Sequence, residues 1–266
     1  MSRVNQLTGK KIVITGASSG IGADVAREVA KRGGVPILLA RRVSKLEELV
    51  ATIAKTYRVK AYAIALDVSH EQEVVRVFSD IYKQIGEIDV LINNAGFALF
   101  KTADEATHEE VKSMFEVNVL GLIACTRAVL PTMKVKDAGQ IINVASIIGK
   151  VPTPKASAYA ATKHAVLGFT NALRMEVSDT KIQITAVNPG PVKTAFFDLA
   201  DESGNYTKNI NKMMLDSKTV AKKIVATIGT RKRELNVPRW MGLGGKCYAI
   251  MPVLMEKTLG KRLFQK

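Results

Sequence analysis

The sequence predicts one α/β domain in which a doubly wound parallel sheet of about seven strands carries helices on both faces. The first observation behind this prediction is that short β-branched runs alternate along the chain with amphipathic stretches of helical period. The second is that glycine-rich or polar motifs directly follow these runs, as expected where parallel strands end at a common binding edge. The third is the length of 266 residues, which is enough to bury one large core.

Composition favours a compact enzyme over a fibrous or disordered protein, because 47% of the residues are apolar and only 6% are aromatic. The two cysteines lack the spacing of a disulfide framework and the three histidines are scattered, so we expect a reducing compartment and no metal site. The first ten residues are too short for a signal peptide, and no apolar run approaches the ~18 residues that a membrane span needs. We therefore expect a cytoplasmic protein, soluble or peripheral at a membrane surface.

The first strand, residues 11–15, runs into a glycine-rich turn and then a helix over residues 23–31. Glycines let such a turn close tightly and let a diphosphate approach the N–H groups at a helix N-terminus. A structural loop is the alternative, but the position between strand and helix favours nucleotide binding. The residues predicted to bind cofactor in this turn are Gly16, Ser18, Ser19, Gly20, Ile21 and Gly22.

The second strand, residues 35–40, ends in Arg41 and Arg42. An acidic residue at this point would hold a free ribose 2′-hydroxyl, whereas arginine suits a 2′-phosphate. The sequence therefore predicts NADP as the cofactor. The alternative is a solvated basic turn.

The next helix is expected to begin at Ser44, because Glu47 three residues on completes a capping-box pattern. The third strand, residues 61–66, ends in Asp67 and Val68, where the adenine edge would be held. After a helix over 71–85, a fourth strand over 88–92 closes on small and amide residues that would let the backbone pass close beneath a flat ring. The residues predicted to contact cofactor there are Asn94, Ala95 and Gly96.

A long helix over residues 107–131 carries Asn118 in an apolar setting. A buried amide without partners is costly, so Asn118 must find them. It is either a structural core residue or part of a proton relay that reaches Lys163.

The strand over 140–145 is followed by Ser146, and the helix over 156–177 carries Tyr159 and Lys163 four positions apart. Four residues are about one helical turn, so these two side chains project from the same face. A free tyrosine titrates near pH ~10. An adjacent ammonium stabilises the phenolate, and a serine hydroxyl can hold the carbonyl oxygen being reduced. The plain alternative is a helix that carries a tyrosine and a lysine on one face without catalysis.

The sixth strand, residues 182–187, leads into further residues predicted to bind cofactor: Pro189, Gly190, Val192 and Thr194. Residues 189–217 have mixed polarity and are expected to form a lid over substrate, with a plain surface loop as the alternative. The residues predicted to contact substrate are Phe97, Ser146, Ile148 and Tyr159. A helix over 218–229 and an edge strand over 234–237 complete the predicted catalytic domain, residues 1–238.

These motifs together resemble those of the short-chain dehydrogenase/reductase family. The resemblance covers residues 11–194, with a weaker continuation to 239. It rests on TGASSGIG at 15–22, NNAG at 93–96, Asn118, Ser146, YAATK at 159–163 and PG at 189–190. The basic residue after the second strand is similar to that of the NADP-preferring members. The basic C-terminal extension is similar to that of the branch with dehydrogenase/reductase member 7 and the hydroxysteroid dehydrogenases.

The resemblance implies a Rossmann-type domain, an NAD(P) cofactor and a catalytic tetrad of Asn118, Ser146, Tyr159 and Lys163. Tyr159 would be the acid/base and Ser146 would orient the substrate oxygen. Lys163 would also bind the nicotinamide ribose, and Asn118 would hold a water that links Lys163 to solvent. Tyr159 and Lys163 therefore count among the expected cofactor contacts as well.

We predict an NADPH-dependent oxidoreductase that interconverts a carbonyl and a secondary alcohol on a fairly apolar small molecule. The alternatives are a 3-oxoacyl thioester reductase of fatty-acid synthesis and a non-catalytic NADP-binding regulator. A homo-oligomer, either dimer or tetramer, is expected, because two helices show a second apolar face. The residues behind that expectation are Val119, Leu122, Ile123, Val129, Ala165, Val166, Phe169 and Leu173.

Residues 239–266 form a basic, apolar extension rather than a separate domain, with six Lys and Arg residues and one acid. Pro252 would break or kink a helix there. One interpretation is that the extension packs on the subunit or its neighbour and covers the cleft. The other is peripheral contact with an anionic membrane. Nucleic acid is not expected as a partner, because no recognition motif accompanies the charge.

Overall fold

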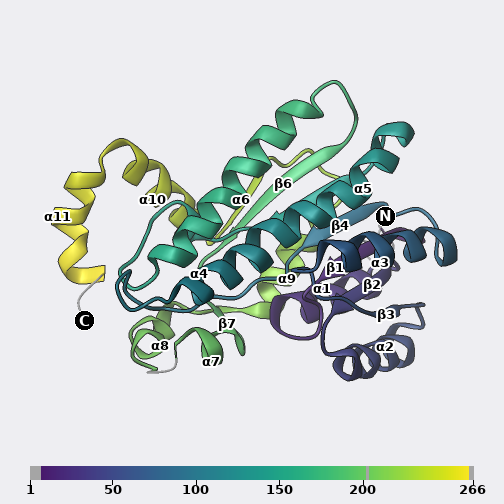
Figure 1. The fold of residues 1–266 in the computed structure, drawn as a ribbon, viewed down its shortest axis with the longest axis horizontal. Coiled ribbons are helices and arrows are strands. Elements are labelled where there is room, and N and C mark those ends of the chain that lie inside the picture. The colour runs from purple at the N-terminus through teal and green to yellow at the C-terminus, as the bar shows by residue number, and fades with distance from the viewer. Residues whose placement is uncertain (1–6, 202–203, 264–266) are drawn as a thin grey trace.

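The computed structural model describes residues 7–201 and 204–263, and it confirms the predicted fold (Figure 1). The main sheet has seven strands in the order β3-β2-β1-β4-β5-β6-β9, and every neighbouring pair is parallel. The strands are β1 (Lys11–Thr15), β2 (Val35–Ala40), β3 (Tyr62–Ala65), β4 (Val90–Asn93), β5 (Gln140–Val144), β6 (Gln183–Pro189) and β9 (Glu234–Val237). The strand order reverses at β1 and β4, and in sheets of this kind ligands bind beside the carboxyl ends of the strands at that point.

Alternate residues of the central strands face two different layers of helices, which is why these strands are apolar throughout. Ile12 and Ile14 join one core cluster, whereas Val13 between them joins the other. The helices of the first layer are α1 (Gly20–Lys31), α2 (Val43–Tyr57) and α9 (Ser217–Val225). Those of the second are α3 (Glu71–Gln84), α5 (Leu122–Lys136) and α6 (Ser157–Glu176).

The helix predicted over residues 107–131 is longer than expected and changes its winding. The structure has three consecutive segments here: α4 (His108–Phe115), a π-helical segment (Glu116–Gly121) and α5. Pro131 lies inside α5 and does not end it, so the predicted boundary was wrong. Val129 and Met133 on either side of the proline are both buried against the sheet, and this burial stabilises the helix through the proline.

Two helix starts also differ from the sequence prediction. α2 begins at Val43, and no side chain caps it, so the capping box predicted at Ser44 was wrong. The earlier start places Ser44 inside the first turn, beyond the capping position. α1 begins at Gly20, which makes the second half of the glycine-rich turn the first turn of that helix.

One helical stretch of the described chain, His108–Lys136, is long and apolar enough to cross a membrane by length and composition alone. This finding corrects the expectation that no run approaches that length. The stretch is weak evidence for a span, because 44% of its most apolar window is buried inside the protein and core helices pass the same test. Cys125 and Val129 of this helix are fully buried in the second core cluster.

The chain makes a structured excursion between β6 and α9. β7 (Val192–Lys193) pairs in parallel with β8 (Leu215–Asp216), and α7 (Phe196–Ala200) and α8 (Asn205–Ile210) lie between them in sequence. The segment corresponds to the predicted lid. Residues 202–203 of that prediction, and residues 1–6 and 264–266 at the ends of the two predicted regions, lie outside the described residues.

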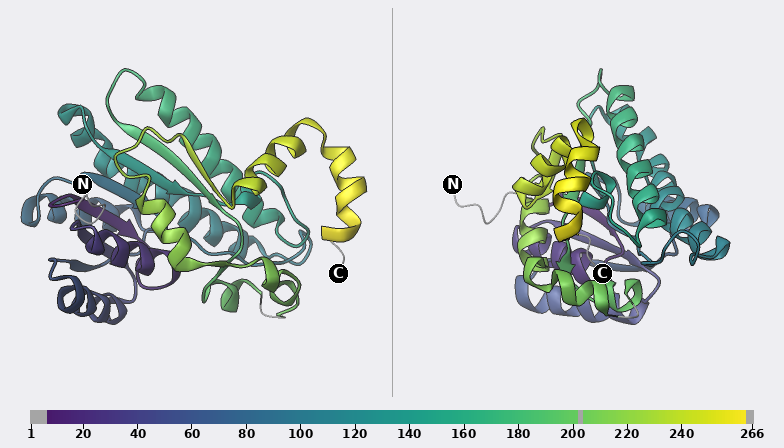
Figure 2. Two further views of the ribbon diagram at one scale, coloured as in Figure 1. Left: turned by 180° about the vertical axis from the view of Figure 1, so that it is seen from behind. Right: turned by 90° about the vertical axis from the view of Figure 1, so that its left-hand side faces the viewer.

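The C-terminal extension forms two helices, α10 (Arg239–Ile250) and α11 (Pro252–Leu263), which project from one side of the domain (Figures 1 and 2). Met251 separates them, just before the proline where the sequence predicted a break. α10 packs against β9, whereas α11 lies mainly against α10. The packing interpretation of the extension therefore applies to its first helix.

Candidate active site

The glycine-rich turn between β1 and α1 is shaped so that only glycine fits. Gly16 and Gly20 have φ of +65° and +55°, in the left-handed region that disfavours other residues. A Cβ on Gly16 would lie 2.8 Å from the Ala95 Cα, and one on Gly22 would lie 2.4 Å from the Gly16 carbonyl oxygen. The N-cap residue Ser19 makes no side-chain cap, and the first turn of α1 carries no acid. The turn is thus a cradle with helix N–H groups suited to a phosphate.

The loop after β4 is fastened to this turn by hydrogen bonds. The Asn94 side-chain amide donates to the carbonyl oxygens of Thr15 and Gly16, at 3.0 and 3.2 Å. The backbone N–H groups of Asn94 and Ala95 both donate to the Thr15 hydroxyl at 3.0 Å. Thr15 was not singled out from the sequence, although its position as the last residue of β1 is the signal that would have identified it.

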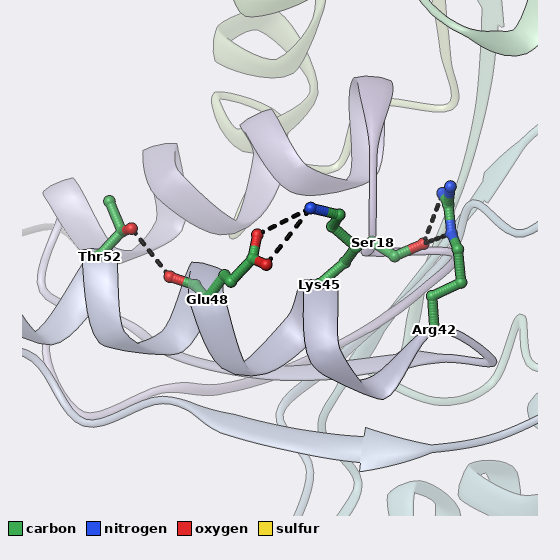
Figure 3. A network of polar contacts seen from close by, with 5 residues as sticks. All are labelled: Ser18, Arg42, Lys45, Glu48 and Thr52. Carbon is green, nitrogen blue, oxygen red and sulfur yellow. Dashed lines mark hydrogen bonds and ion pairs between the residues drawn. The ribbon is translucent and has the colours of Figure 1, made fainter.

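Arg42 lies across the glycine-rich turn (Figure 3). Its Nη2 and Nε lie 3.0 and 3.3 Å from the Ser18 hydroxyl, as drawn in Figure 3. The Nη2 also donates to the Ser19 hydroxyl at 2.8 Å. Because both hydroxyl oxygens accept from the guanidinium, their protons remain available to another acceptor. Arginine and serine donors beside the predicted adenosine ribose fit a 2′-phosphate.

Arg41 and Asp67 form a second, weaker contact at the ends of β2 and β3. The Arg41 side chain is 77% exposed, and its Nη1 is 3.8 Å from the Asp67 carboxylate. That carboxylate accepts from the N–H and hydroxyl of Ser69. Burial alone would raise the pKa of Asp67, but the hydrogen bonds from Ser69 and the charge of Arg41 outweigh burial and lower it. Val68, the next residue, is buried.

The predicted cofactor residues after β6 lie next to the glycine-rich turn in space, although they are far from it in the sequence. A Cβ on Gly20 would lie 3.2 Å from the Thr194 methyl group, so this loop touches the turn. The Gly190 N–H donates to the Val237 carbonyl at 2.7 Å, and Val192 is buried beside them. The structure thus brings the predicted cofactor residues that follow β1, β2, β3, β4 and β6 to one edge of the sheet.

Lys163 is the unusual charge of the site. Its side chain is only 5% exposed, and its Nζ donates to the Val144 carbonyl at 3.1 Å. The same Nζ is 5.6 Å from the centre of the Tyr159 ring. Burial lowers the pKa of Lys163 from 10.5 to about 8. In the described part of the chain no acid forms an ion pair with Lys163.

Asn118 is fully engaged with its neighbours inside the π-helical segment. Its side chain accepts from the Phe97 N–H at 2.9 Å and donates to the Phe97 carbonyl at 2.8 Å. It also donates to the Thr162 hydroxyl at 3.1 Å, which itself donates to the Tyr159 carbonyl at 2.7 Å. Asn118 therefore fastens the loop after β4 to the helix that carries Tyr159. Thr162 was not predicted, although it lies within the YAATK motif.

Ser146 and Tyr159 lie beneath an apolar cover. The Ser146 hydroxyl accepts from the Ile148 N–H at 3.1 Å, in the short 3₁₀ turn that follows β5. The Tyr159 ring packs edge-on against Phe100 and obliquely against Phe196 of α7, with centroids 6.1 and 6.0 Å apart. The predicted substrate residues Phe97 and Ile148 belong to the same cluster as Tyr159. The sequence also predicted that Phe100 lines this cleft, and Phe196 lies within the segment 189–217 that was predicted to form the lid.

Comparison with known proteins agrees with this geometry. The model of the short chain dehydrogenase family matches residues 10–203. An "NADP-dependent 3-hydroxy acid dehydrogenase" of Schizosaccharomyces pombe is 44% identical over 195 residues, which are 73% of this chain and 75% of that protein. A "Farnesol dehydrogenase" of Aedes aegypti is 33% identical over 237 residues, 86% of this chain and 94% of that protein. A short-chain dehydrogenase from Sphingobium yanoikuyae, solved with NADPH, has a TM-score of 0.78 at 27% identity, covering 92% of this chain and 96% of that one.

Proposed function

This chain belongs to the short-chain dehydrogenase family, and from that membership we propose that it is an NADPH-dependent oxidoreductase acting on a carbonyl or secondary alcohol. The observation that carries the proposal is the buried Lys163 ammonium beside Tyr159, at the sheet edge where the glycine-rich turn and Arg42 also lie. A buried charge without an ion-pair partner is costly and is typical of functional sites.

Tyr159 is the proposed acid/base. The nearby Lys163 ammonium favours the phenolate, so Tyr159 donates its proton to the substrate oxygen during reduction and takes it back during oxidation. The Ser146 hydroxyl, held at the start of its turn by the Ile148 N–H, orients that oxygen. A bound nicotinamide cofactor supplies or accepts the hydride. Asn118 keeps its predicted place beside the site, and its hydrogen bonds in the structure support a positioning role.

The assignment of NADPH as the cofactor rests on hydrogen-bond donors that are suited to its phosphate groups. The tight turn at Gly16 and Gly22 forms only because both residues lack a Cβ, which would collide with Ala95 and with the Gly16 carbonyl, and it leaves helix N–H groups for a diphosphate. Arg42 and Ser18 would hold the 2′-phosphate that distinguishes NADP from NAD. The name of the yeast relative, which includes NADP, points in the same direction.

The substrate class is proposed from the cover over Tyr159. Phe100 and Phe196 pack on the Tyr159 ring, and Ile148 belongs to the same apolar cluster, which favours a fairly apolar substrate. The names of the two relatives concern a 3-hydroxy acid and farnesol, an acid and a lipid-like alcohol. Both kinds of compound, together with a 3-oxoacyl thioester, therefore belong in a substrate panel.

The test follows the absorbance of NADPH in both directions. Apolar ketones, aldehydes, 3-oxo acids and a 3-oxoacyl thioester are assayed with NADPH, and a 3-hydroxy acid and farnesol are assayed with NADP⁺. Tyr159→Phe serves as the blank. We expect turnover of apolar carbonyls by wild type and none by the variant. If NADPH binds to wild type while every carbonyl and alcohol fails, the protein is a non-catalytic NADP-binding regulator. If only the thioester reacts, it is a 3-oxoacyl thioester reductase.

We also propose that the chain self-associates, but on other residues than those that first suggested it. Five of the eight residues that suggested a second apolar face are buried within the chain itself: Val119, Leu122, Val129, Val166 and Leu173. That part of the sequence argument was wrong, because helical period does not tell which neighbour covers a face. Leu120 and Met175, 58% and 76% exposed on the same helical stretches, still favour a partner. Light scattering tests this, and a 28.9 kDa particle at micromolar concentration would refute it.

A further inference from the structure

Helix α10 is attached to the domain by its small residues. A Cβ on Gly242 would lie 2.4 Å from the Asn236 side-chain nitrogen, and one on Gly245 would lie 3.1 Å from the Lys150 Cβ. These glycines and Met241 are the buried residues of the helix. A helix that packs through glycines comes close to the body of the protein but leaves its large side chains on the other side.

Apart from Met241, large apolar side chains of α10 face outward. Trp240, Leu243 and Ile250 are 61%, 64% and 77% exposed, and their spacing of three and then seven residues places them along one face. Met251, Val253 and Leu254 continue the exposed apolar surface into the start of α11. Among the described residues, six of the twelve exposed large hydrophobic side chains lie in this short stretch. Such a concentration marks an interaction surface.

The two helices are held to each other as one unit. The Tyr248 hydroxyl donates to the Glu256 carboxylate at 2.8 Å, and this bond raises the pKa of Tyr248. Glu256 is the one acid among residues 239–266. The apolar surface is thus carried on a small helical hairpin (yellow in Figure 2) that stands away from the sheet.

Cations surround the base of this hairpin. Lys223, Lys232 and Arg239 line a pocket between α9, β9 and the start of α10, and no acid is among its lining residues. Among the described residues, none of these three side chains forms an ion pair or a hydrogen bond, and the one bond to Lys232 from a side chain is from the Thr185 hydroxyl to its backbone carbonyl. Lys246 and Lys257 lie further along the hairpin and are exposed. Arg239 directly precedes Trp240, so the cationic pocket adjoins the apolar face.

We propose that the outer face of α10 and the start of α11 docks on an anionic lipid membrane, with the adjacent pocket taking a lipid phosphate group. Exposed Trp and Leu beside Lys and Arg are what an interfacial helix requires. A second copy of the chain is the less favourable occupant, because a two-fold contact over this face would bring the same cations together on a protein of net charge +15.

This surface lies close to the proposed active site. α10 contacts the 3₁₀ turn Ile147–Gly149, which directly follows Ser146, and Gly245 packs on Lys150 at the end of that turn. Docking through α10 would hold the substrate side of the sheet near the membrane. This last consequence rests on the proposed function, whereas the docking itself does not.

The experiment is co-sedimentation of the full-length protein with vesicles of phosphatidylcholine alone or with one quarter phosphatidylglycerol, at low and high salt. We expect binding to the anionic vesicles at low salt and a roughly tenfold or greater loss at high salt. The double variant Trp240→Glu, Leu243→Glu should lose binding by at least the same factor. Its matched control is Val75→Glu on α3, where the side chain is 61% exposed but far from the hairpin in sequence.

The cationic pocket is tested separately. Lys223→Glu with Lys232→Glu should lower binding to anionic vesicles roughly tenfold or more, whereas Lys55→Glu with Lys83→Glu, exposed on α2 and α3, should change it far less. Thermal melting and NADPH binding verify that each variant is folded, independently of turnover. Free inorganic phosphate at millimolar concentration tests whether the pocket takes a phosphate without a membrane. If the folded protein binds free phosphate but does not bind anionic vesicles, the membrane proposal is overturned.

Three further results would overturn the proposal. The first is equal binding to neutral and anionic vesicles, and the second is no binding by the folded wild type. The third is that Trp240→Glu with Leu243→Glu converts an oligomer into a monomer while neither protein binds lipid, which would assign the face to a second copy.

Discussion

Two groups of buried polar side chains lie beside each other in this protein, and helix α6 contributes to both. One group is neutral: Asn93 donates to Thr126 and Asn143, and Asn143 donates to Thr170 of α6. The other group contains a charge, because Lys163 of α6 is buried beside Tyr159 with a backbone carbonyl as its acceptor. Less than two helical turns of α6 separate Thr170 from Lys163.

The difference between the groups shows what each contributes. The neutral group joins the strands β4 and β5 to the helices α5 and α6. Among its polar side-chain atoms in the described residues, only the Asn93 Oδ1 lacks a hydrogen-bond partner. Its hydrogen bonds stabilise the sheet. The lowering of the Lys163 pKa from 10.5 to about 8 corresponds to about 3 kcal/mol lost from stability at neutral pH. We propose that this cost, one helical turn from Tyr159, is retained for catalysis.

The largest effect is expected from Tyr159→Phe. Removing the hydroxyl should lower turnover about 10²- to 10⁴-fold, because the ring stays in its aromatic cluster while the proton donor is lost. NADPH affinity should remain within a few-fold and the melting temperature should hardly change. Single-turnover kinetics and cofactor titration measure both, and substantial remaining turnover would mean that another acid acts.

The neutral group should respond in the opposite way. Asn143→Ala leaves Asn93 and Thr170 without their shared partner in a fully buried site. We expect the free energy of unfolding to fall by about 2–3 kcal/mol, with turnover per folded molecule largely kept. Chemical denaturation combined with activity at low temperature measures this. Turnover that falls as far as in Tyr159→Phe would show that the two groups do not act separately.

The third prediction concerns the preference for NADPH over NADH, which depends on residues away from both buried polar groups. Arg42→Ala should weaken NADPH binding roughly ten- to hundredfold and leave NADH unchanged, because a charged hydrogen bond to phosphate is worth about 1.5–3 kcal/mol. Arg41→Ala should have a much smaller effect, since that side chain lies 3.8 Å from Asp67 whereas Arg42 bonds to the serines of the glycine-rich turn. Equal affinity of wild type for the two cofactors would remove the basis of the NADP assignment.

The sequence predicted the fold and the common location of the site residues, but it did not predict every side-chain contact in the site. The strands β1 and β2 begin and end at the predicted residues, because an apolar β-branched run stops at a glycine-rich or arginine-rich turn. The order of the motifs implied one binding edge, and the structure brings those residues there. Their roles in catalysis and binding remain predictions.

The missed features depend on tertiary contacts. Two successive arginines after β2 look alike in sequence, yet only Arg42 reaches the serines of the glycine-rich turn. The π-helical segment around Asn118 arises from packing between distant segments. The lid was predicted from the sequence, but the contact of its Phe196 with the Tyr159 ring was not. The outward face of α10 follows from glycines whose close contacts no periodicity reveals.

The most direct test of the account is the pH dependence of unfolding for wild type and Lys163→Met, measured without cofactor. The folded pKa of Lys163, about 8, lies below the ordinary value of 10.5, so the unfolded chain binds the extra proton between those values. Below pH 8 the whole cost is present, and it disappears as the pH rises to 10.5. The variant should be more stable than wild type by up to about 3 kcal/mol at pH 7, with the difference shrinking toward pH 10.5, and it should be inactive. A variant that is less stable at pH 7, or a difference that does not change with pH, would contradict the claim that a buried, unpaired ammonium is kept for catalysis.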